Sequence, residues 1–109
     1  MLTTCTRPAP TDSHHDRCGR RLKLFVFLDD VNPRSHPTII ARGTHRYSWM
    51  GIVHDDATRF EDAYVRATFG DRLVPMLGRA GGGFIFDTNT IHKGDCAGVH
   101  EARNVIVIE

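Results

Sequence analysis

The feature that most constrains the fold is a series of short runs of β-forming residues, each bounded by glycine, proline or aspartate. The strongest run, residues 22–28 (LKLFVFL), predicts a well-buried strand that ends in the turn chemistry of residues 29–33. Weaker runs predict further strands at residues 37–41, 73–77, 84–86 and 104–109. Short strands punctuated in this way favour an all-β sandwich or jelly-roll over an α/β fold.

One helix is expected among the strands. Residues 57–69 carry apolar side chains at helical spacing, Asp55 or Asp56 can cap the first turn, and Gly70 can end the helix. The glycines at residues 81–83 predict a tight turn into the strand that follows them. The expected fold class is therefore all-β with one inserted helix.

Residues 1–21 are polar, contain Pro8 and Pro10, and show no hydrophobic periodicity, so they predict an irregular N-terminal segment. Residues 22–109 would form the rest of one small domain, because 109 residues hold one domain at most. The sequence has no apolar signal segment and its 3 cysteines have no CxxC spacing, which predicts a cytoplasmic protein. A net charge of +1 gives no electrostatic argument for a nucleic acid or a membrane as partner.

Two H-x-D pairs offer metal ligands, because residues i and i+2 of an extended chain point to the same side. His54 and Asp56 lie next to the expected helix, where the aspartate is better explained as an N-cap. His14 and Asp16 lie just before the strongest predicted strand. The alternative for this second pair is a solvated polar terminus, and with 7 histidines in the chain the motif alone does not decide.

A third ligand is offered by His92, which follows the strand at residues 84–86. A histidine near an apolar strand is also common as a structural residue. Arg103, at the start of the last strand, strengthens the functional interpretation. Its guanidinium can hold a carboxylate through two parallel charge-assisted hydrogen bonds, whereas a structural arginine there would need a carboxylate partner from the protein.

Together these residues resemble the phytanoyl-CoA dioxygenase-like family of Fe(II)/2-oxoglutarate-dependent oxygenases, over most of residues 14–109. The resemblance rests on the order and spacing of several segments. These are the His14–Asp16 pair, residues 22–31 (LKLFVFLDDV), residues 40–45 (IARGTH), residues 82–94 (GGFIFDTNTIHKG) and Arg103.

The resemblance implies a double-stranded β-helix, or jelly-roll, of which this chain would be the C-terminal, incomplete part. His14, Asp16 and His92 match the iron ligands of the family, and Arg103 matches the residue that holds 2-oxoglutarate. The implied cofactors are Fe(II), 2-oxoglutarate as co-substrate, and O2. The implied reaction converts 2-oxoglutarate to succinate and CO2 while a small or lipid-like organic substrate is hydroxylated.

The sequence also departs from the family. The family's P-G-S-H segment is R-G-T-H at residues 42–45, residue 94 is glycine where some members supply a hydroxyl, and members usually have more than twice this length. An inactive jelly-roll fragment without stable metal binding is therefore the alternative. A cupin-like metal enzyme or sensor is a third hypothesis, but the chain lacks the H-x-H pair that cupins use.

The remaining donors are assigned to other roles. His45 is expected to be structural, and Cys96 is expected to be a small buried filler. His36, His54 and His100 are expected on the surface.

Overall fold

The part of the chain that the structure describes forms two antiparallel β-sheets and one α-helix. The computed structural model describes residues 2–5, 13–15, 21–46, 58–60, 62–94 and 103–109. One sheet has four strands, in the order β1 (Leu2–Cys5), β9 (Arg103–Ile108), β3 (Leu22–Phe27) and β7 (Gly83–Asp87). The other has five strands, in the order β5 (Thr58–Phe60), β2 (Ser13–His15), β8 (His92–Gly94), β4 (Thr38–Ala41) and β6 (Leu73–Pro75). The expectation of a mainly β fold with one helix is confirmed.

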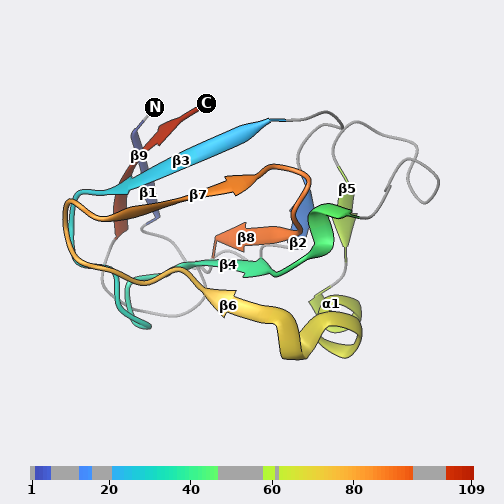
Figure 1. Cartoon of the computed structure of the whole chain (residues 1–109). Helices are drawn as coiled ribbons and strands as arrows, with labels where there is room; N and C mark the ends of the chain where they lie inside the picture. The colour runs from blue at the N-terminus through green and yellow to red at the C-terminus, as the bar shows by residue number, and fades with distance from the viewer. Residues whose placement is uncertain (1, 6–12, 16–20, 47–57, 61, 95–102) are drawn as a thin grey trace.

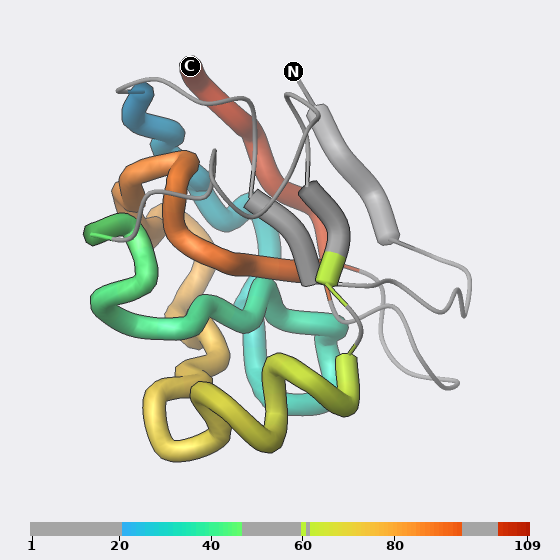
Figure 2. The backbone as a smooth tube through the Cα atoms, turned by 90° about the vertical axis from the view of Figure 1, so that its right-hand side faces the viewer, coloured from blue at the N-terminus to red at the C-terminus, as the bar shows by residue number. Residues whose placement is uncertain are grey.

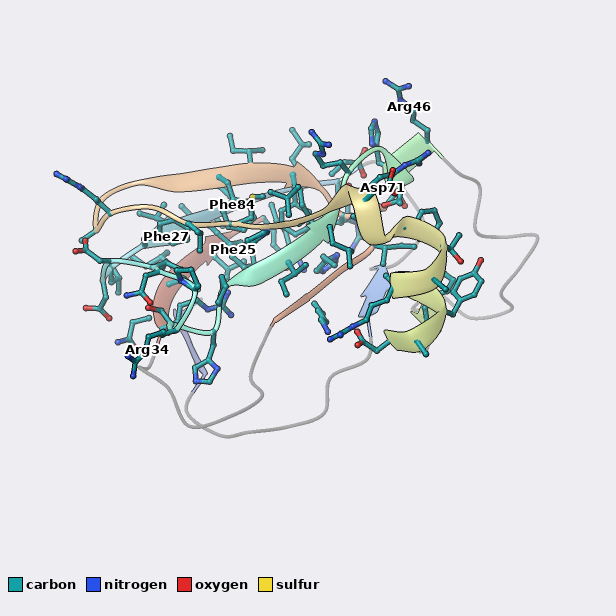
Figure 3. The ribbon with its side chains drawn as sticks, turned by 90° about the horizontal axis from the view of Figure 1, so that it is seen from below. Phe25, Phe27, Arg34, Arg46, Asp71 and Phe84 are labelled. Carbon is teal, nitrogen blue, oxygen red and sulfur yellow. The ribbon has the colours of Figure 1, made fainter. Side chains whose placement is uncertain are left out.

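The two sheets face one another, with β3 and β7 above β8, β4 and β6 in Figure 1. The inner face of the four-stranded sheet carries alternate residues of its strands, as the two-residue period of a strand requires. Phe25 is paired in register with Phe84 on one side and with Val107 on the other. The rings of Phe25 and Phe84 have centroids 5.0 Å apart, and Figure 3 shows both beside Phe27. This aromatic layer forms the core between the sheets.

The outer face of the four-stranded sheet is apolar and exposed. Leu22 and Ile85 are 64% and 63% exposed, and Ile106 and Ile108 on β9 lie on the same face. The run at residues 22–28 was correctly predicted to hold a strand, but the prediction that it is well buried was wrong, because only Phe27 is buried and Leu22 and Leu28 are exposed. Phe25 and Phe27 pack in the core, whereas on the outward face Leu24 and Val26 are half-buried and Leu22 is exposed.

Helix α1 (Asp62–Phe69) packs against the opposite face of the five-stranded sheet, beneath β4 in Figure 2. A second core cluster forms there from Val65 and Phe69 of the helix with Ala41 and Ile91. The helix begins later than its apolar spacing predicted. Thr58–Phe60 forms strand β5 instead, because those residues pair with β2. The capping residues proposed at positions 55 and 56 lie outside the described residues.

The described part of the N-terminal segment is not irregular, so that prediction is corrected. Leu2–Cys5 pairs with β9, and Ser13–His15 pairs with both β5 and β8. Both strands obtain their backbone hydrogen bonds from residues more than 40 positions away in the sequence. Local pattern could not reveal them, because their order depends on these distant partners.

The glycine turn before β7 was predicted correctly. Gly81 has φ +86°, a conformation that glycine adopts without strain. A Cβ atom on Gly83 would lie 2.0 Å from the carbonyl oxygen of Phe25. The close pairing of β7 with β3 therefore requires glycine at the start of β7.

Candidate metal and co-substrate site

Strand β8 lies between β2 and β4, and its register places two of the predicted metal ligands opposite one another. His92 on β8 is the partner of His14 on β2, and of Ile40 on β4. Directly opposed positions of antiparallel strands share one face of the sheet, with Cβ atoms about 4.5–5.5 Å apart. That spacing suits two histidines that bind one metal ion.

The side chain of His92 is buried and oriented by a backbone contact. Its Nδ1 lies 2.7 Å from the carbonyl oxygen of Thr90, and a carbonyl can only accept, so Nδ1 carries the proton. In that tautomer Nε2 carries the lone pair, which is how a metal-ligating imidazole is commonly held. The ring also meets the edge of Phe86 on β7, at a centroid distance of 4.8 Å. His92 therefore faces the space between the two sheets.

Thr44 fixes the chain just before His92. This fully buried residue of η1 (Thr44–Arg46) donates its hydroxyl to the carbonyl of Ala41 at 2.7 Å. The same hydroxyl oxygen accepts a hydrogen bond from the N–H of Ile91 at 2.8 Å. The sequence placed Thr44 in a family-like segment but gave no sign of this role, because its partner is 47 residues away.

Arg103 is a buried cation between the sheets. It is 5% exposed, and its Nη1 donates to the hydroxyl of Thr38 on β4. Its Nε has no hydrogen-bond partner, and no carboxylate pairs with its guanidinium, among the residues that the structure describes. Burial lowers the pKa of the Arg103 guanidinium by desolvation, yet an arginine remains charged at neutral pH. A buried cation of this kind calls for an anionic partner.

Arg103 and His92 approach the same region from opposite sheets. Thr38, the contact of Arg103, is paired in register with Gly94, which lies two residues after His92 on the same face of β8. Two residues along a strand span about 7 Å. A dicarboxylate between the sheets could therefore reach both the guanidinium and a metal held beside His92.

The described residues fit the Fe(II) and 2-oxoglutarate that the resemblance implied. His92 has its tautomer set for metal binding, His14 holds the opposed position, and Arg103 has an Nε without a described partner. Asp16 lies outside the described residues, as do His54, Asp56, His100 and Cys96. No three metal donors are found together within the described ranges, in which His14 is placed by its backbone.

Two other histidines are now placed. His36 is buried, so the prediction of a surface residue was wrong. The chain turns sharply there: His36 has φ +53°, and Ser35 accepts from the N–H of Asn32 at 3.2 Å, which draws residues 35 and 36 inward. His45, expected to be structural, is exposed on η1.

No protein-family model matches the sequence, and a search of curated proteins finds no match. Among solved structures, the chain is similar to AviO1 from Streptomyces viridochromogenes Tue57, with a TM-score of 0.71 and 28% identity over 97% of this chain. It is also similar to the apoform of EctD from S. alaskensis, with a TM-score of 0.55 and 18% identity over 97% of this chain. These matches cover 46% of AviO1 and 41% of EctD, so the chain spans less than half of either protein.

The likeness shows that this chain shares the fold of the matching parts of AviO1 and EctD. It does not single out the phytanoyl-CoA dioxygenase-like family that the motifs resemble. Within the described residues no helix is long and apolar enough to cross a membrane.

Proposed function

We propose that this chain carries the iron and co-substrate site of an Fe(II)/2-oxoglutarate-dependent dioxygenase. Such an enzyme converts a substrate C–H group, O2 and 2-oxoglutarate into the alcohol, succinate and CO2. The observation that carries the proposal is the register pair of His14 and His92 across β2 and β8. The fold likeness to AviO1 and EctD supports it.

In this proposal His14, Asp16 and His92 hold Fe(II) through two imidazoles and one carboxylate, the ligand set common in ferrous oxygenases. Bound iron would supply the redox chemistry of oxygen. Thr90 keeps the proton of His92 on Nδ1, so that Nε2 remains available to donate its electron pair. Arg103 binds the distal carboxylate of 2-oxoglutarate through a pair of charge-assisted hydrogen bonds, with Thr38 orienting the guanidinium.

The two sheets contribute by excluding water. Phe86 packs against the ring of His92, and the phenylalanine layer of β3 and β7 continues from it through Phe84. In such an apolar surrounding, the attraction between Arg103 and a carboxylate is screened less than in water. The substrate itself is a small or lipid-like organic molecule in this proposal.

The test is succinate formation by the protein with Fe(II), 2-oxoglutarate and O2, screened with candidate substrates. We expect iron-dependent succinate that is lost in His92→Ala and retained in His45→Ala, whose histidine is exposed on η1. Succinate formed equally by the His92→Ala protein would exclude His92 as a ligand. No succinate from a protein that binds both Fe(II) and 2-oxoglutarate would exclude the activity.

A second candidate is an inactive jelly-roll fragment that does not retain metal. The exposed apolar outer face of the four-stranded sheet favours this alternative, because an uncovered face of that kind promotes association. Iron retention separates the two, since the fragment would lose Fe(II) on gel filtration.

A further inference from the structure

Three arginines gather around one pocket on the side of the five-stranded sheet where β4 ends. The pocket has a volume of about 500 Å³ and is lined by Arg42, Gly43, Arg46 and Arg72. We propose that this arginine pocket binds an oxyanion group, phosphate or carboxylate, of a small-molecule ligand. The assignment of that ligand as the substrate rests on the proposed function, whereas oxyanion binding itself does not.

The backbone brings the arginines together from two segments of the chain. The N–H of Arg42 donates to the carbonyl of Arg72 at 3.0 Å, which joins the end of β4 to η3 (Gly70–Arg72). The N–H of Arg46 donates to the carbonyl of Gly43 at 3.3 Å, which closes the turn that joins Arg42 to Arg46. The convergence is thus fixed by main-chain contacts.

Gly43 leaves room beside this turn. It has φ +80°, a left-handed conformation that glycine adopts without strain. A Cβ atom at that position would meet no atom within 4 Å, so the space beside the backbone is open to a ligand. A group as large as a phosphate can therefore approach the main chain between the arginines.

Two of the three arginines of the pocket have no ion-pair partner among the residues that the structure describes. Arg42 and Arg46 are exposed, and neither forms an ion pair within the described residues. Arg72 is half-buried, with its guanidinium carbon 5.9 Å from the centroid of the Phe69 ring, a contact that orients it. Asp71 is the neighbouring acid, but it does not line the pocket.

This concentration is local, because the whole chain has a net charge of only +1. Like charges held together repel, and a bound anion with several acceptor oxygens relieves that repulsion while matching the guanidinium donors. A volume of about 500 Å³ is within the range of small-molecule sites. A nucleic acid would instead call for a basic stripe and a higher overall charge.

The pocket lies close to the candidate metal site along the chain. Arg42 comes two residues after Ile40, the register partner of His92, so the pocket begins within about 7 Å of that position. Thr44, which fixes the residue before His92, belongs to the same turn. An anionic group held here would place the remainder of a substrate toward the space between the sheets.

The experiment is an NMR titration of the metal-free 109-residue protein with inorganic phosphate, pyrophosphate and malonate at low ionic strength. The phosphate and malonate arms distinguish a phosphate group from a carboxylate group. We expect Arg42→Gln/Arg46→Gln to weaken binding of the preferred anion by about 5- to 30-fold. Arg34→Gln is the matched control, because Arg34 is an exposed arginine at the opposite end of the molecule in Figure 3.

The control should bind the anion with a dissociation constant within about twofold of that of the unmodified protein. Arg42→Lys/Arg46→Lys should have an affinity between those of the unmodified protein and the glutamine double variant, since lysine keeps the charge but not the paired N–H donors of arginine. Equal weakening by Arg34→Gln, unchanged binding by the double variant, or no binding of any of the three anions would overturn the proposal. His92→Ala should bind the anion normally and lose metal. If the unmodified protein binds the anion but no metal, only the proposed function is refuted. If it binds metal but none of the three anions, only the arginine pocket is refuted.

Discussion

Replacing Arg103 by leucine should have opposite effects on the ligand-free and the ligand-bound protein. Arg103 is 5% exposed, and its guanidinium has no carboxylate partner among the described residues. Replacing even a buried ion pair by apolar residues is often neutral or stabilises a protein by about 1–4 kcal/mol, and a buried cation without a carboxylate partner should follow the same direction. The unfolding temperature of the ligand-free Arg103→Leu protein should therefore stay constant or rise, by about 4 °C or more for each kcal/mol.

Binding of 2-oxoglutarate should be weakened strongly by the same substitution. Loss of a buried, hydrogen-bonded charge partner costs about 2–5 kcal/mol, which corresponds to a dissociation constant raised about 30-fold to several thousand-fold. Fe(II) binding should change little, because no metal ligand is removed. Calorimetric titration with Fe(II) and then with 2-oxoglutarate under anaerobic conditions measures both affinities. Arg103→Lys keeps the charge but loses the paired N–H donors of the guanidinium. Its affinity for 2-oxoglutarate should lie between those of the unmodified and the Arg103→Leu proteins.

A free energy of unfolding lowered by about 3 kcal/mol or more in ligand-free Arg103→Leu would contradict this prediction, because that is the cost of breaking a buried ion pair. Arg103 would then have a carboxylate partner within the protein. Equal losses of Fe(II) and 2-oxoglutarate affinity would likewise indicate a role in folding.

Three further predictions concern stability and association. Thr44→Val should lower the free energy of unfolding by about 1–3 kcal/mol in urea titrations, because a buried N–H loses its acceptor; an unchanged value would contradict the role given to that hydroxyl. Ile85→Thr/Ile108→Thr, on the exposed outer face of the four-stranded sheet, should reduce association in sedimentation experiments while leaving stability within about 0.5 kcal/mol; unchanged association would mean that this face is not the contact. The hydrogen bond from Lys93 lowers the pKa of the Asp62 carboxyl below its usual 3.8, so its stabilisation is complete above that pH and is lost as the pH falls further. Asp62→Asn should therefore cost less than about 1 kcal/mol at pH 7 and nothing at strongly acidic pH, because the pair is partly solvated; a cost that persists in acid would show that charge is not its basis.

The strands of the core could be predicted because their pattern is local. Phe25 and Phe27 alternate with outward-facing residues, and Gly81 and Gly83 mark the turn into the next strand. The outer face could not be anticipated, because a continuous apolar run is typical of a strand covered on both sides, whereas Leu22 is exposed.

The site was predictable only in its chemically distinctive residues. His92 and Arg103 were chosen from residue type and spacing, and the structure places both at the space between the sheets, while their roles stay predictions. Thr44 and Thr38 were not assigned their roles, because threonine is common and each contact joins residues 47 or 65 positions apart. The strand that carries His14 was missed for the same reason, since its order depends on pairing with distant strands.

The central claim is that His14 and His92 bind one metal ion together. An anaerobic titration of Fe(II) in the presence of 2-oxoglutarate tests it, with His14→Ala, His92→Ala and the exposed His45→Ala compared with the unmodified protein. We expect one Fe(II) per chain, affinity lowered by more than about 100-fold in each of the first two variants, and unchanged affinity in His45→Ala. Binding by either His14→Ala or His92→Ala that equals that of the unmodified protein would contradict the claim.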